Sequence, residues 1–166
     1  MPMHMEDLDV VSQLEGVASA LIVPCRMCPA VSVADRTNRP FMQFFRSLFK
    51  SPPLEAYLQS LQNKLKEHGI ESDVFGCTMY HQWFMCMWTY GIRKKLSRKA
   101  GQYDAVIVLG CNSATVTVAD AVEPLGLKVV EGMIPIGIMN GKMRFKFPLT
   151  IAVEDTKVVP LEHPGA

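Results

Sequence analysis

Residues Ala105-Val106-Ile107-Val108-Leu109-Gly110-Cys111 form an apolar, β-branched run that ends in a cysteine. Two more runs end in the same way, Ala20-Leu21-Ile22-Val23-Pro24-Cys25 and Ser72-Asp73-Val74-Phe75-Gly76-Cys77. Short apolar runs of this kind are typical of the buried strands of a parallel sheet. Because parallel strands all point the same way, the three cysteines would gather along one edge of the sheet. That edge is where open α/β folds build their sites.

Helical patterns separate these runs. The clearest helix begins after Ser51, which we expect to be its N-cap, with prolines in the first turn and Gly69 as the stop. The other expected elements are an entry helix over 6–17, an irregular stretch over 26–40, helical turns over 41–49, helices over 78–99 and 114–122, and a fourth strand over 127–130.

The period of the pattern changes near the C-terminus. Residues 134–139 and 142–147 flank Asn140-Gly141, the preferred pair for a type I′ turn, so we expect a hairpin. The segments 149–154 and 157–159 also look extended.

The order of these elements predicts one α/β domain over residues 1–160, with 161–166 as a loose tail. We expect three layers around a mostly parallel, flavodoxin-like sheet with a C-terminal β-hairpin. In the strand order 2-1-3-4, the strands that end at Cys77, Cys25 and Cys111 would be neighbours, about 4.8 Å apart.

Composition limits the classes of function. The chain has 166 residues, of which 49% are apolar, and a net charge of +1, which argues against a general nucleic-acid binder. We find no window for a membrane span, and the acidic start lacks the layout of a signal peptide. A cytoplasmic, reducing setting is therefore expected, where cysteines are more often metal-binding or catalytic than paired. The five cysteines cannot all pair with one another in any case.

Cys25 and Cys28 form a C-x-x-C motif. Such a motif is compatible with a redox dithiol, half of a zinc site or two ligands of an iron–sulfur cluster. Zinc and clusters both accept four thiolates, which Cys25, Cys28, Cys77 and either Cys86 or Cys111 could supply. We rank Cys86 last, because on an apolar helix its side chain can point into the core. The alternative is that these cysteines are small buried hydrophobes.

Cys111 directly precedes a predicted helix that starts with Asn112 and Ser113. The unpaired amides and the positive end of the helix dipole would stabilise a thiolate or an anion there. These three residues are therefore candidates for cofactor binding, although Asn112 or Ser113 could equally be an ordinary N-cap. Trp83 could stack on a planar cofactor, or belong to the core or to an interface.

The segments Val23-Pro24-Cys25-Arg26-Met27-Cys28, 103–111, Gly132-Met133-Ile134-Pro135 and Met139-Asn140-Gly141 resemble a known family. It is the family of the C-terminal, zinc-finger-type partner subunit of methylenetetrahydrofolate reductase in anaerobes, and the resemblance covers residues 18–145.

The resemblance implies a non-catalytic subunit beside an enzyme, in an anaerobic one-carbon or electron-transfer setting. It carries Cys25, Cys28, Cys111 and Cys77 over as cysteines of the family pattern. The family usually continues into a cysteine-rich tail that binds clusters. This chain ends without one, so we expect a short relative with a different partner.

Our preferred hypothesis is a metal or iron–sulfur subunit of an anaerobic oxidoreductase or one-carbon complex. Cys25, Cys28, Cys77 and Cys111 would be ligands of a cluster or, less preferred, of zinc. The Met- and Trp-rich helix 79–92 would dock a larger redox or one-carbon subunit, or a second copy. The alternatives are a sulfur-relay protein with a persulfide on Cys111 and a non-catalytic partner-binding module.

Overall fold

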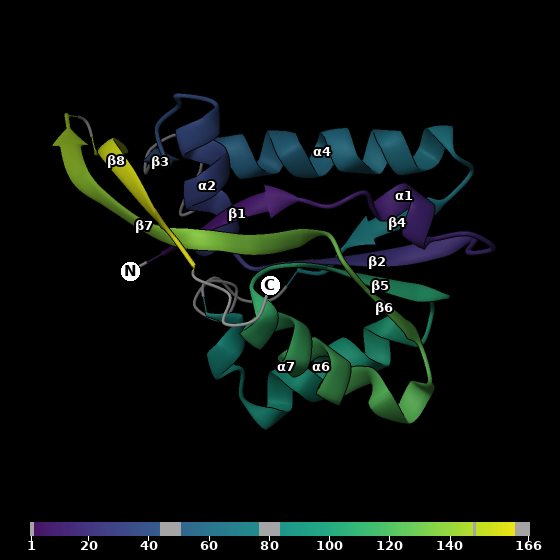
Figure 1. The fold of residues 1–166 in the computed structure, drawn as a ribbon. Helices are drawn as coiled ribbons and strands as arrows, with labels where there is room; N and C mark the ends of the chain where they lie inside the picture. Colours follow the sequence, from purple (N-terminus) through teal and green to yellow (C-terminus); the bar gives the residue numbers. More distant parts are fainter. Residues whose placement is uncertain (1, 44–50, 77–83, 148, 162–166) are drawn as a thin grey trace.

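A computed structural model of the chain describes residues 2–43, 51–76, 84–147 and 149–161. One of its two sheets is parallel, has the order β4-β2-β5-β6 and lies in the middle of the body (Figure 1). Its strands are β2 (Ser19–Pro24), β4 (Glu71–Val74), β5 (Ala105–Leu109) and β6 (Lys128–Glu131). These are the four predicted strands in the predicted order 2-1-3-4.

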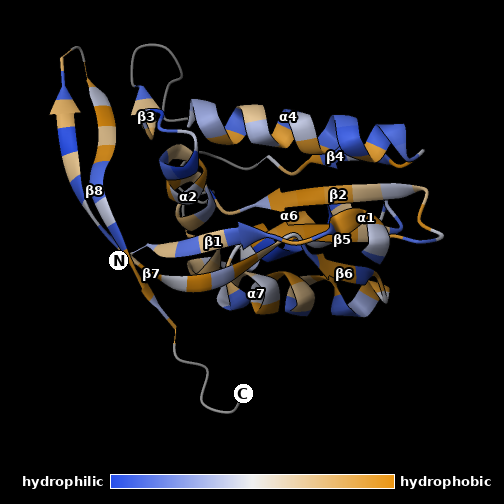
Figure 2. Cartoon of the chain, turned by 45° about the horizontal axis from the view of Figure 1, so that its top comes forward, coloured by the Kyte–Doolittle hydropathy of each residue, from blue (hydrophilic) through white to orange (hydrophobic). Residues whose placement is uncertain are grey.

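Side chains alternate between the two faces of this sheet. Val23 and Val108 point to a core that they share with α6 (Tyr90–Ala100) and α7 (Asn112–Val122). Ile22 and Ile107 point to the opposite core, which includes α2 (Cys28–Arg36) and α4 (Pro52–Glu67). Figure 2 shows hydrophobic colour along most of β2, between helices with hydrophilic turns. Burial on both faces explains why β2 and β5 are continuous apolar runs.

The second sheet is antiparallel, with the order β1-β7-β8-β3, and it was not expected as a separate sheet. Its strands are β1 (Met3–Asp7), β3 (Met42–Gln43), β7 (Met133–Lys146) and β8 (Thr150–Pro160). A single flavodoxin-like sheet in three layers is therefore not confirmed. The mixed α/β class and the parallel sheet are.

The entry helix predicted over 6–17 is mostly wrong. β1 pairs antiparallel with β7, from Met3 opposite Ile138 to Asp7 opposite Met133, and only the short α1 (Val10–Gln13) is helical. Strand pairing with a segment far along the chain overrides the weak local helical pattern.

The irregular stretch predicted over 26–40 contains α2 instead. Pro29 lies in the first turn of this helix, where no amide hydrogen is needed. Asn38 adopts a left-handed φ of 50° just after the helix, ahead of Pro40. The residues that looked like breakers are therefore the start and stop signals of a helix.

Asn140-Gly141 is not a hairpin turn, because β7 continues through it to Lys146. The pairing with β8 jumps here from Asn140 opposite Lys157 to Lys142 opposite Glu154. A Cβ on Gly141 would lie 2.8 Å from Val153 Cγ1, so the irregularity favours glycine. Asn-Gly thus lies opposite a bulge in β8, and the chain reverses between β7 and β8 instead.

Three other expectations fall partly outside the described residues. In 41–49 the structure describes only Phe41 and β3, and in 161–166 only Leu161. In 78–99 it describes residues 84–99, which form the 3₁₀ turn η1 (Met85–Met87) and, from Tyr90, α6; only this last part of the predicted helix is confirmed. A second 3₁₀ turn, η2 (Glu123–Leu125), follows α7. None of the helices in the described chain is both long and apolar enough to cross a membrane.

Candidate functional site

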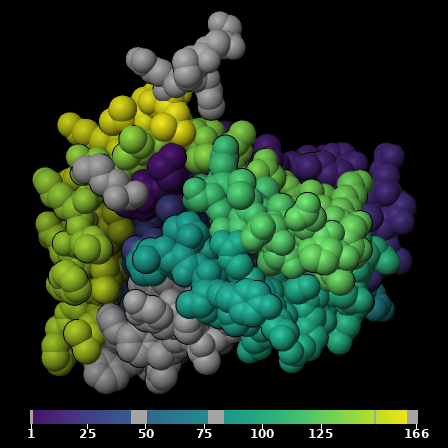
Figure 3. Space-filling view, turned by 90° about the horizontal axis from the view of Figure 1, so that it is seen from below, coloured from purple at the N-terminus to yellow at the C-terminus, as the bar shows by residue number. Residues whose placement is uncertain are grey.

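All the cysteines that the structure describes line one cavity of about 250 Å³. They come from three segments: Cys25 and Cys28 follow β2, Cys111 follows β5, and Cys86 lies in η1. The other lining residues are Pro2, Met27, Phe84 and Ala114. Figure 3 shows a hollow between the yellow-green β7–β8 side and the teal segment, with purple N-terminal atoms at its edge. The strand ends therefore bring Cys25 and Cys111 together, two of the three cysteines expected at this edge, while the third, Cys77, lies outside the described residues.

Cys25 is the most buried of these thiols, with 7% of its surface exposed. Its amide donates to the carbonyl of Leu109 (2.8 Å), which continues the β2–β5 ladder to the site. Burial raises the pKa of the thiol from 9.0 to about 11, although hydrogen bonds from the backbone of Met27 and Met85 lower it. Those hydrogen bonds favour a charged sulfur, but they offset only part of the effect of burial, so the thiol stays protonated at neutral pH.

Cys28 is the first residue of α2 and is half-buried. Burial raises its pKa, and negative charge on Cys111 or Cys86 would raise it further. The thiols are thus close enough to repel one another when ionised. A cation between them would reverse this repulsion and stabilise the thiolates.

Cys111 is itself the N-cap of α7, rather than Asn112 or Ser113. Its carbonyl accepts from the amides of Ala114 (2.8 Å) and Thr115 (3.1 Å), while its side chain makes no capping hydrogen bond. The sulfur therefore remains available to the cavity. Asn112 and Ser113 are exposed and do not line the cavity.

Cys86 is exposed and lies on the rim of the cavity, although we ranked it last from the sequence. Met85 and Trp88 on either side of it are buried, and Trp88 packs on Phe75 with ring centroids 5.7 Å apart. Met85 and Trp88 are three residues apart in the sequence. This spacing is the signal that would have placed Cys86 on the side of the segment that faces away from the core.

Two predicted site residues, Cys77 and Trp83, lie outside the described residues. In the proposed docking segment 79–92, the described part is not one surface. Trp88 belongs to the core, whereas Met87 and Tyr90 are 76% and 79% exposed.

Arg26 lies between the two cysteines of the C-x-x-C motif and is 8% exposed. Its guanidinium forms an ion pair with Glu55 in the first turn of α4, while its buried Nε has no partner. The ion pair ties the start of the thiol site to α4.

Within the described parts of the chain, no three His, Cys, Asp or Glu side chains stand together so that they could already hold a metal ion. The cavity therefore has several cysteine side chains along its lining, but they are not arranged as the ligands of a metal ion.

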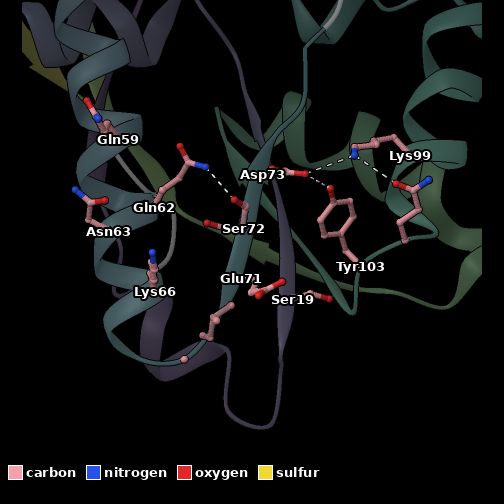
Figure 4. A pocket seen from close by; sticks show the side chains of 13 residues that line it. Ser19, Gln59, Gln62, Asn63, Lys66, Glu71, Ser72, Asp73, Lys99 and Tyr103 are labelled. Carbon is pink, nitrogen blue, oxygen red and sulfur yellow. Dashed lines mark hydrogen bonds and ion pairs between the residues drawn. The ribbon is translucent and has the colours of Figure 1, made fainter.

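A second cavity, of about 910 Å³, lies against β4, between α4 and the end of α6 (Figure 4). Gln62 donates to the carbonyl of Ser72 (2.9 Å), and Tyr103 donates to Asp73, which Lys99 approaches at 3.5 Å. No cysteine lines it. These polar contacts hold neighbouring elements together, and we assign no chemistry to this cavity.

In comparisons with protein-family models, curated proteins and solved structures, nothing matches the chain. The resemblance to the reductase partner subunit therefore stays a prediction, and the case for function depends on the thiol cavity.

The burial of Cys25 predicts a loss of stability at alkaline pH. Below pH 9 the thiol is mostly protonated in the folded and in the unfolded protein, so it does not make the free energy of unfolding depend on pH. Between about pH 9 and 11 the unfolded chain releases this proton first, which favours unfolding. We expect a loss of roughly 2 kcal/mol at about pH 10.5. Urea unfolding at several pH values should detect this loss of stability. Cys25→Ala should lack the part that comes from Cys25 and keep the part that comes from the tyrosines, which both proteins share. Equal pH dependence in the two proteins would contradict the prediction.

Proposed function

We propose that the chain binds an iron–sulfur cluster, or alternatively zinc, through the cysteines of this cavity. It would do so as a non-catalytic or electron-transfer subunit of a cytoplasmic oxidoreductase or one-carbon complex in an anaerobe. One observation carries the proposal: cysteines from three separate segments line a single cavity at the carboxyl edge of the parallel sheet β4-β2-β5-β6.

The donor set fits such a group. Zinc and iron–sulfur clusters both take four thiolates, and Cys25, Cys28, Cys86 and Cys111 would supply them. Cys77 remains a candidate that the described residues do not test. Because no three side chains in the segments that the structure describes already stand at ligand positions, the proposal requires the thiols to rotate toward the cavity. When bound, a cluster would supply one-electron transfer.

The chain's own residues would assist in two ways. Backbone hydrogen bonds from Met27 and Met85 to Cys25 would stabilise its thiolate and tune a bound group. The apolar lining, which includes Phe84 and Met27, would limit the access of water. Because burial raises the pKa of Cys25 and Cys28, uptake of a metal would release protons and strengthen as the pH rises.

The test is the iron, zinc and sulfide content of protein prepared and reconstituted without oxygen, together with its absorption spectrum. We expect bound metal, and a broad band near 400 nm if the group is a cluster. Cys28→Ser should lose most of the metal without losing its circular dichroism, because Cys28 interacts electrostatically with each of the thiols of Cys25, Cys86 and Cys111. The control is Val116→Ser on the exposed face of α7, which should keep all of it.

Cys86→Ser and Cys77→Ser compared side by side identify the remaining ligand. We expect the larger loss from Cys86→Ser, because Cys86 lines the cavity. A folded, metal-free wild-type protein would refute the proposal. The sulfur-relay function would then remain. It is favoured because the Cys111 sulfur makes no capping hydrogen bond to α7 and can react. There a persulfide donor would pass its outer sulfur to the Cys111 thiolate and leave as a thiolate, and intact-mass measurement would detect the added sulfur.

A partner subunit would approach from the side of η1, because Cys86 and the exposed side chains of Met87 and Tyr90 lie there.

A further inference from the structure

The outer half of β7 pairs with β8 on one side and, among the described residues, has no strand on the other side. β1 pairs with β7 only from Met133 to Ile138, and the amide of Met139 donates to the carbonyl of Pro2 (2.9 Å). From Asn140 to Lys146, β8 is the one strand beside β7 among the described residues. Figures 1 and 2 both show this part of β7 and β8 as an arm at the side of the body. An exposed edge of this kind offers its backbone groups to another strand.

The two faces of this edge differ in character. Lys142, Arg144 and Lys146 alternate with Met143 and Phe145 along the strand. Met143 and Phe145 are 65% and 67% exposed, and Phe147 just beyond them is 99% exposed. Figure 2 shows alternating blue and orange bands on the arm. A strand built only to prevent aggregation would carry the cations without this row of exposed apolar side chains.

The charges on the arm are arranged asymmetrically. The three cations lie on the free strand β7, whereas their partners Glu154 and Asp155 lie on the inner strand β8. Arg144 and Lys146 share the single carboxylate of Glu154. A strand added beside β7 would therefore lie directly next to the cations, with the carboxylates on the far side and too few to neutralise all three.

A second copy of the chain does not complement this edge. In an antiparallel pair of two β7 strands centred on Arg144, each Lys142 would face a Lys146. Arg144 would face its own equivalent. Like charges directly opposite each other destabilise a strand pair. The complementary segment alternates acidic and apolar residues, because acidic side chains would face the cations and apolar ones would cover Met143 and Phe145.

We propose that residues 140–147 bind an extended acidic segment of another protein, which adds to the β7 edge as a further strand. Its alternate residues are Asp or Glu, and those between them are apolar. Backbone hydrogen bonds supply affinity, and the alternating side chains supply specificity, as in other cases of strand addition. The proposal does not depend on the thiol site.

A fluorescein-labelled peptide of about six residues, the length of an ordinary strand, that alternates Glu and Val is the probe. Fluorescence anisotropy should show that it binds the full chain more weakly as ionic strength rises. The same peptide with Lys in place of Glu should not bind, and neither should a Glu–Val peptide with N-methylated alternate amides, which cannot pair. Phe145→Ser should weaken binding at least about tenfold, as loss of an exposed aromatic anchor does.

Val116→Ser is the matched control, because Val116 is 67% exposed on α7, away from the arm. It should leave affinity unchanged. Absence of binding, equal binding of the Lys peptide, or an equal loss in Val116→Ser would overturn the proposal. A dimer in sedimentation that Phe145→Ser dissociates would assign the edge to a second copy instead. Binding of a single-stranded oligonucleotide that Phe145→Ser abolishes would assign it to nucleic acid.

Discussion

Gly110→Ala is expected to lower the free energy of unfolding by about 3 kcal/mol, at the upper end of the range for overpacked cores. A Cβ on Gly110 would lie 2.6 Å from the Cβ of Ala114 and 3.5 Å from that of Cys25. Ala114 is buried in the first turn of α7, and its Cβ is fixed directly to the backbone. The conflict therefore cannot be relieved by rotating a side chain, and α7 with its N-cap Cys111 has to move.

Urea unfolding under reducing conditions measures this loss. Gly91→Ala is the matched control, because Gly91 lies in α6 and a Cβ there meets nothing within 4 Å. It should raise stability by up to about 1 kcal/mol, since alanine favours a helix. The double variant Gly110→Ala/Ala114→Gly removes the obstructing methyl and should recover part of the loss. If Gly110→Ala were no less stable than Gly91→Ala, the close packing of β5 on α7 would not be a constraint.

The parallel sheet could be predicted because its two central strands are buried. β2 and β5 are buried on both faces, so their sequences are continuous apolar runs that need no knowledge of their neighbours. The antiparallel sheet could not be read in this way. β1 is only five residues long, and its place depends on pairing with β7, about 130 residues away in the sequence.

Turn and stop signals were ambiguous for a physical reason. Proline and asparagine end a helix, but the same residues also begin one or bound it, as Pro29 and Asn38 do around α2. Asn-Gly permits a left-handed turn but does not require it. At Gly141 the absence of a side chain serves close strand packing, while Asp155 and Leu149 adopt the left-handed conformations.

The sequence indicated that Cys25 and Cys111 lie near each other, but it did not indicate where Cys86 lies. Strand ends fix where Cys25 and Cys111 lie, because parallel register leaves them at one edge. Cys86 follows no strand, and its position depends on the burial of Met85 and Trp88 on the face behind it. Helical periodicity assumed over the whole segment obscured that contact.

Glu55→Gln is expected to lower the free energy of unfolding by about 2 kcal/mol, between the values for exposed and for fully buried ion pairs, because only Arg26 is buried. The side chain of Arg26 is 8% exposed and that of Glu55 is 37% exposed. Without the carboxylate, a cation that already has an unpartnered buried Nε would keep its charge away from water. Arg26→Met should cost less, because the exposed part of Glu55 can be hydrated.

The double variant Arg26→Met/Glu55→Gln should then be more stable than Glu55→Gln alone, since no isolated buried charge remains. Asp155→Asn is the matched control. It breaks the ion pair with Lys142, whose side chains are 67% and 80% exposed, and should change stability by less than about 0.5 kcal/mol. Equal losses in Glu55→Gln and Asp155→Asn would mean that Arg26 is solvated in solution. In that case the C-x-x-C segment would be held by the β2–β5 ladder and α2 packing, without help from α4.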